Sequence, residues 1–168
     1  MIGSGGSRRG RIRTTLSQLS RNRRIRRGRG RTPVLSAALP RDIAFRAIDG
    51  VGPFADSAEA AAIEELGLRW IRSSLHGARL WGSAHYGWSV IDGLQTLALN
   101  IACAAWIARL CSAAASRPLV ALEDVRTGIG RVDRHAGRAP WLGSPIERVR
   151  LRYLRLDDGL RRVVRSNW

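Results

Sequence analysis

Eleven arginines dominate the first 33 residues of the chain, and no acidic residue accompanies them. Guanidinium groups pair bidentately with phosphate oxygens and stack on bases. Glycines between the arginines keep the backbone adaptable enough to follow a phosphate chain. Because phosphate contacts carry little sequence information, we expect this segment to bind nucleic acid or another polyanion non-specifically. The arginines in question are Arg8, Arg9, Arg11, Arg13, Arg21, Arg23, Arg24, Arg26, Arg27, Arg29 and Arg31.

A second group of side chains with chemical potential lies between residues 80 and 88. Trp81, His85, Tyr86 and Trp88 alternate there with small residues and glycines. Bulky aromatic side chains near glycines can line a ligand pocket. The same side chains can also fill the core of an alanine-rich helical bundle. Both interpretations stay open, and the four residues are a candidate pocket.

The motifs of the common enzyme classes are missing from the sequence. It has no glycine-rich phosphate loop, no His-Glu-x-x-His, no Cys-x-x-Cys and no serine nucleophile elbow. Its three histidines match no standard spacing of metal ligands. Cys103 and Cys111 would be separated by about 12 Å along one helix, too far for a disulfide, and are expected to be small buried side chains. We therefore expect no cofactor, no metal and no catalytic residue.

The net charge is divided unevenly along the chain. The sequence has 168 residues, and its 29 basic residues are all arginines, opposed by 13 acids. Residues 34–168 hold 18 arginines and all 13 acids, so they carry +5 and residues 1–33 carry +11. Since residues 1–33 contain few apolar side chains, burial cannot offset their chain entropy. The sequence predicts a disordered basic arm at 1–33 and a helical domain at 34–168. Two alternative origins of the arm stay open: it is a transit peptide, or the start codon is assigned too far upstream.

Helical periodicity covers most of residues 34–168, without strand-like alternation of useful length. Asp56 and Glu59 form a capping-box pattern ahead of an apolar face that begins at Ile63. Ser144 and Glu147 form a second such pattern, with a proline at the first helical position. The predicted fold is all-α, a small bundle of four or five helices behind the disordered arm. The last long helix is expected to bury the face formed by Ile146, Val149, Tyr153, Leu156 and Leu160.

Residues 89–115 form the most hydrophobic segment. From Gly93 to Ser116 the only charged side chain is Arg109, a length that suits a transmembrane helix. Gln95 and Asn100 interrupt the segment, and an arginine deep in a bilayer costs at least about 2.5–3.5 kcal/mol. We therefore expect a helix buried on nearly all sides of the bundle, in a cytoplasmic protein. A membrane anchor at residues 89–115 is the alternative.

The C-terminal half carries a family resemblance. The apolar helix leads through Ser116-Arg117-Pro118-Leu119 to Glu123-Asp124-Val125-Arg126, and then to a stretch from Arg131 to Arg138 that contains Asp133-Arg134-His135. This order resembles the helical C-terminal part of the cysteine-cluster proteins that include flagellin lysine-N-methylases. The resemblance implies a link to lysine methylation through a cysteine cluster. Because the chain has no closely spaced cysteines, it would be a truncated or accessory relative without the cluster.

Charge and the missing motifs together favour a small non-enzymatic helical protein that binds nucleic acid through its arginine-rich arm. The cluster-less methylase relative and the membrane-associated protein remain the alternatives.

Overall fold

A computed structural model describes residues 40, 42–77 and 79–167. The arm at 1–33, with its eleven arginines, lies outside these residues. The described part forms helices α2 (Phe45–Asp49), α3 (Ala60–His76), α4 (Val90–Ala114), α5 (Leu122–His135), α6 (Pro145–Arg155) and α7 (Gly159–Asn167). Three 3-10 turns join them, namely η1 (Phe54–Asp56), η2 (Pro140–Gly143) and η3 (Leu156–Asp158). The all-α prediction is confirmed, since the described residues form no strand; an isolated bridge joins Gly82 and Trp88.

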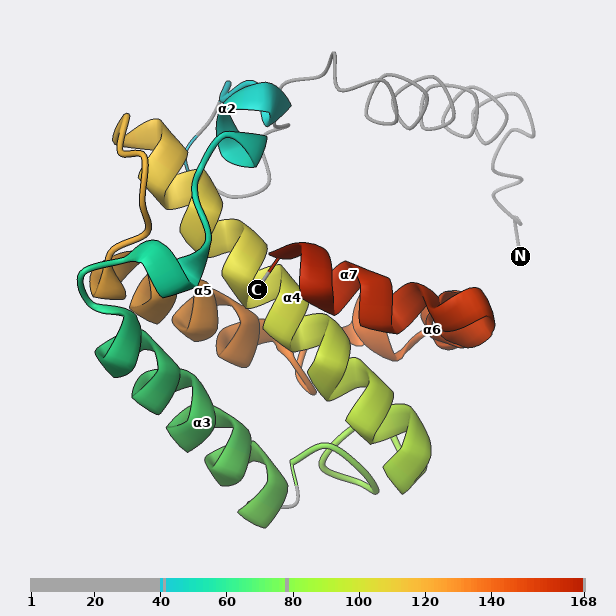
Figure 1. Ribbon diagram of the computed structural model, residues 1–168. Coiled ribbons are helices and arrows are strands. Elements are labelled where there is room, and N and C mark those ends of the chain that lie inside the picture. The colour runs from blue at the N-terminus through green and yellow to red at the C-terminus, as the bar shows by residue number, and fades with distance from the viewer. Residues whose placement is uncertain (1–39, 41, 78, 168) are drawn as a thin grey trace, which may run out of the picture.

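Helix α4 runs through the middle of the molecule (Figure 1). Helix α5 packs along it, α3 lies on the far side of α5, and α6 and α7 cover the opposite flank. The short α2 contacts the C-terminal half of α4, where the rings of Phe45 and Trp106 are 6.4 Å apart. Helix α4 therefore contacts α2, α5, α6 and α7, whereas α3 packs on α5 and η1.

Helices α4 and α5 approach each other at backbone distance. The contact uses small side chains of α4, with Ala104, Ala105 and Ala108 fully buried. A Cβ atom added to Gly128 of α5 would lie 2.3 Å from the carbonyl oxygen of Ala104. Only glycine fits at position 128, whereas a Cβ on Gly130 would meet nothing within 4 Å.

The hydrophobic core lies between η1, α3, α4 and α5. Because α4 supplies alanines there, the bulky members come from the other segments. Leu66, Ala113, Leu122 and Ile129 pack around this core. Its buried members are Val51, Phe54, Ile63, Ala105, Ala108, Val120 and Val125.

The predicted capping box at the start of α3 is wrong. Helix α3 begins at Ala60, and Asp56 lies in η1. Ser57 Oγ accepts from the Glu59 backbone N–H (3.2 Å) and donates to the carbonyl of Val120 (2.8 Å). The Glu59 carboxylate accepts from the backbone N–H of Leu122 (2.7 Å), so it stabilises the N-terminus of α5 instead of its own helix.

Ser144 supplies its half of the predicted capping box at the start of α6, whereas the Glu147 carboxylate accepts from Arg150 and not from the Ser144 backbone N–H. Ser144 Oγ accepts from the backbone N–H of Glu147 (3.4 Å), and proline occupies the first turn. The predicted buried face of that helix is wrong. The helix buries Leu151, on the side opposite to the predicted one. Four of the five residues expected in the core form an exposed stripe, whereas Leu160 is half-buried. We call these four the α6 stripe: Ile146, Val149, Tyr153 and Leu156, exposed by 66%, 51%, 71% and 57%.

Helix α4 is less enclosed than predicted. Its middle is buried, yet Val90, Ile91 and Leu94 of the first turns are exposed, and so is Cys103, which was expected to be buried. Among the described residues, α4 is the one helix long and apolar enough to cross a membrane. A core helix of a soluble bundle has the same length and composition.

Candidate functional site

The aromatic segment forms a closed turn between α3 and α4. The backbone N–H of Gly82 donates to the Trp88 carbonyl (2.9 Å), and that of His85 donates to the Gly82 carbonyl (2.9 Å). Gly82 and Gly87 have φ values of 63° and 71°, a left-handed conformation that glycine adopts without strain. Ser89 then caps α4 by accepting from the backbone N–H of Asp92. The turn is thereby held rigidly against the start of α4.

Three of the four predicted pocket residues meet in this turn. The ring of His85 lies 4.9 Å from that of Tyr86 and 5.5 Å from that of Trp88. All three line a cavity of about 70 Å³, together with Asn100 and Glu147 among others. Trp81 is half-buried and does not line this cavity.

His85 is an unusual residue within this cluster, because its side chain is only 1% exposed. Neither ring nitrogen has a hydrogen-bond partner of good geometry in the part of the chain that the structure describes. Burial lowers the pKa of His85, against a weaker opposing effect of the Arg79 backbone. A neutral imidazole, with one donor and one acceptor nitrogen, therefore faces the small cavity.

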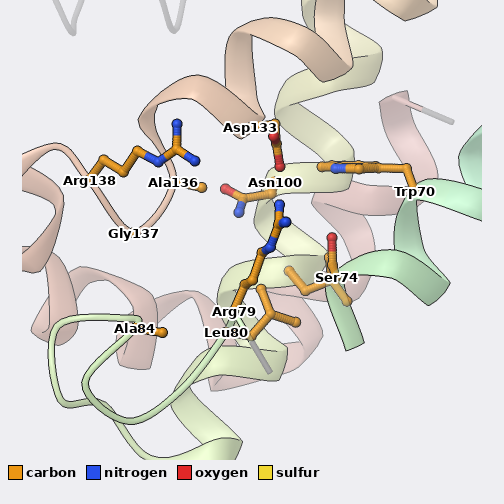
Figure 2. A pocket seen from close by; sticks show the side chains of 11 residues that line it. Trp70, Ser74, Arg79, Leu80, Ala84, Asn100, Asp133, Ala136, Gly137 and Arg138 are labelled. Atoms are coloured by element: carbon orange, nitrogen blue, oxygen red, sulfur yellow. The ribbon is translucent and has the colours of Figure 1, made fainter. Parts of the chain in front are cut away.

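A larger cavity of about 260 Å³ adjoins the first one. Asn100, Ala136 and Gly137 border both cavities, and a Cβ on Gly137 would come within 3.3 Å of His85 Nδ1. The larger cavity has an apolar floor, with Leu80 and Leu97 buried. Figure 2 shows the polar side chains that surround it: Trp70, Ser74, Arg79, Asn100, Asp133 and Arg138.

The charged side chains of this cavity form no ion pair within the part of the chain that the structure describes. Arg79, Asp133 and Arg138 are exposed at its rim, and none of them forms an ion pair with another described residue. Trp70 Nε1 is buried and has no hydrogen-bond partner among the described residues. The cavity thus presents charged side chains of both signs that are unpaired among the described residues, beside the unpartnered Nε1–H of Trp70.

A basic surface occupies the other flank of the molecule. Residues 145–167, in α6, η3 and α7, hold seven arginines against three acids. This segment therefore supplies +4 of the +5 carried by residues 34–168. Four arginines, which we call the α6–α7 arginines, form no ion pair in the described structure: Arg155, Arg161, Arg162 and Arg165.

An ion pair between distant parts of the chain fixes the orientation of α6. Nε and Nη2 of Arg148 donate to Asp92 Oδ2 at 2.9 and 2.6 Å, and Asp92 is 5% exposed. Burial acts to raise the pKa of Asp92, but hydrogen bonds from Arg148 and Ser89 and the charges of Arg148 and Arg152 outweigh it, so the pKa is lowered. The pair holds the Arg148 side of α6 against α4 and turns the α6 stripe to solvent.

Sequence reasoning missed the charged and polar rim of the larger cavity. Neither Trp70 nor Asp133 was among the predicted pocket residues. Arg79 and Arg138 are single arginines in two separate loops, so no spacing links them in the sequence. Gly137, next to Arg138, was the one available signal of a turn at this site. It adopts a φ of 73° where the chain turns around the cavity.

Comparison with protein-family models, with curated protein sequences and with solved structures finds no significant match. The resemblance to the cysteine-cluster methylases stays a prediction. Within the described residues, no three His, Cys, Asp or Glu side chains are placed to hold a metal ion.

Proposed function

We propose that this protein is a non-enzymatic helical polyanion-binding protein, with nucleic acid as its foremost ligand. The α6–α7 arginines carry the proposal, because they form no ion pair in the described structure and lie in the segment that holds most of the net charge of the domain. Arginines without acidic partners keep their full charge available to phosphates.

The shape of this flank supports the same function. Arg155, Arg161 and Arg165 line a groove of about 500 Å³ between α4 and α7, which also contains Asp158. Arg109 Nη1 donates to the carbonyl of Ser166 (3.3 Å) and so ties α7 to α4. Ala98, Leu160 and Val164 also line this groove, so the three guanidinium groups border an apolar surface, where they can pair bidentately with phosphates.

The arm at 1–33 adds eleven arginines to the same chain. We propose that the arm provides most of the affinity and that the α6–α7 arginines provide a second, structured contact. Both act on phosphates, so binding does not discriminate between sequences. Such a function suits a cytoplasmic protein.

The test is fluorescence anisotropy of a labelled DNA duplex titrated with the full chain and two double variants. In the first, Arg161→Gln and Arg162→Gln remove two α6–α7 arginines. In the matched control, Arg72→Gln and Arg134→Gln remove two exposed arginines, also without ion pairs in the described structure, from α3 and α5. The first variant should bind several-fold more weakly than the control. Equal affinities would contradict a role for the α6–α7 arginines.

A second candidate function is attachment to the surface of an anionic membrane. It is favoured by the α6 stripe, because helix geometry places Arg150 and Arg152 on its two sides. Sedimentation with vesicles that contain phosphatidylserine tests it. The double substitution Val149→Ser and Tyr153→Ser should reduce vesicle binding if the stripe inserts between lipids, and should leave duplex binding unchanged.

A further inference from the structure

The larger cavity, between α3, α4 and the segment that follows α5, has properties that binding of a phosphate backbone does not use. Its volume of about 260 Å³ is slightly below the range of pockets for drug-sized ligands, which indicates a smaller molecule. It lies apart from the α6–α7 arginines, none of which lines it.

Two arginines make one part of this cavity suitable for a carboxylate. Arg79 comes from the connection between α3 and α4, and Arg138 from the connection after α5. Figure 2 shows both guanidinium groups turned toward the Asn100 amide from opposite sides. Neither arginine forms an ion pair with another described residue, so both can pair with the oxygens of a ligand.

An acidic group balances the two arginines. The carboxylate of Asp133 points into the cavity beside Trp70 (Figure 2). It forms no ion pair within the described residues, although two arginines line the same cavity. Unpaired charges of both signs around one small cavity are complementary to a molecule that itself carries both charges.

The remaining lining residues indicate the chemistry of the rest of the ligand. Leu80 and Leu97 are 4% and 6% exposed and form an apolar floor. The Trp70 ring lines one side of the cavity, and its Nε1–H is buried without a partner in the described structure. Burying an unpaired donor is unfavourable, and a hydrogen-bond acceptor on a ligand would remove this cost. Apolar floor and polar rim together fit a small molecule with one apolar end.

We propose that this cavity binds a free α-amino acid with an apolar side chain of about the size of leucine. Arg79 and Arg138 bind its carboxylate, Asp133 and the Asn100 carbonyl oxygen bind its ammonium group, and its side chain packs on Leu80 and Leu97.

The first test is isothermal titration calorimetry of the full chain with L-leucine and two analogues. L-leucinamide lacks the carboxylate, and 4-methylpentanoate lacks the ammonium group. L-leucine should bind, and each analogue should bind at least about tenfold more weakly, because each loses charge-assisted hydrogen bonds. Absence of heat with L-leucine at millimolar concentrations, or equal binding of all three molecules, would overturn the proposal.

Two substitutions assign the charges, and both positions are exposed, so the fold should persist. Arg138→Gln should weaken the binding of L-leucine and 4-methylpentanoate at least about tenfold and leave leucinamide unaffected. Asp133→Asn should weaken L-leucine and leucinamide and leave 4-methylpentanoate unaffected. Arg134→Gln, one residue from Asp133 but outside the cavity, is the control and should bind like the parent. Unchanged L-leucine binding in both cavity variants, with melting curves like the parent, would refute the site.

Discussion

Alanine substitution at Gly128 and at Gly130 of α5 should change the stability of the domain in opposite directions. Both positions lie inside the helix, where replacing glycine by alanine favours the helical backbone by about 1 kcal/mol. At position 130 nothing lies within 4 Å of the new methyl group, so Gly130→Ala should stabilise the domain by about 0.5–1 kcal/mol.

Position 128 adds a steric cost that exceeds this gain. The new methyl group would lie 2.3 Å from the carbonyl oxygen of Ala104, and the carbonyl carbon and Cα follow at 3.1 and 3.4 Å. These are backbone atoms, so α4 and α5 must separate by about 1 Å, and overpacking of this kind costs about 1–3 kcal/mol. Because the α4–α5 contact also encloses the core, Gly128→Ala should lose up to about 2 kcal/mol net.

The assay is thermal unfolding of the parent and both variants, followed by circular dichroism. The two variants should differ by the overpacking cost of about 1–3 kcal/mol, which corresponds to about 4–12 °C in Tm for a domain of this size. If Gly128→Ala melts at or above the temperature of Gly130→Ala, the close contact between α4 and α5 does not exist.

Three further outcomes follow from the burial of individual groups. Burial lowers the pKa of His85, so the folded state favours the neutral imidazole. The free energy of unfolding should therefore fall as the pH drops below about 6.5, by at most about 1.4 kcal/mol per pH unit. In melting curves from pH 5 to 8, His85→Asn should flatten this dependence. Asp92→Asn leaves Arg148 without its carboxylate and should cost about 1–3 kcal/mol in urea unfolding, with a smaller loss at pH 3, where part of the parent's carboxylate is protonated. Leu151→Ala should cost about 2–4 kcal/mol, because that side chain is 3% exposed, whereas Tyr153→Ala should change stability by less than about 0.5 kcal/mol; the reverse order would mean that α6 is turned the other way.

Local signals in the sequence predicted the helices well. Ser144 and Glu147 lie three residues apart, and the cap that they form depends on the chain between them alone. The all-α class and the start of α6 follow from such short-range patterns.

The failures share one physical cause, which is a contact between distant segments. Helix α6 buries the side opposite to its apolar stripe because Arg148 pairs with Asp92, 56 residues away. Glu59 was expected to cap α3, but its carboxylate binds a backbone N–H 63 residues further along the chain. The larger cavity combines residues from α3, α4, α5 and two loops, so no local spacing in the sequence predicts it.

The salt dependence of duplex binding tests the proposed function most directly. Each phosphate neutralised by an arginine lowers the slope of log affinity against log salt by about 0.9. If about six arm arginines contact phosphates, the arm contributes a slope of about −5, and deletion of residues 1–33 should remove that much while leaving the Tm nearly unchanged. The Arg161→Gln and Arg162→Gln double variant of the full chain should make the slope less steep by about 2, and the Arg72→Gln and Arg134→Gln control should leave it as in the parent. A parent slope near zero, or one that neither the deletion nor the double variant changes, would contradict polyanion binding through these arginines.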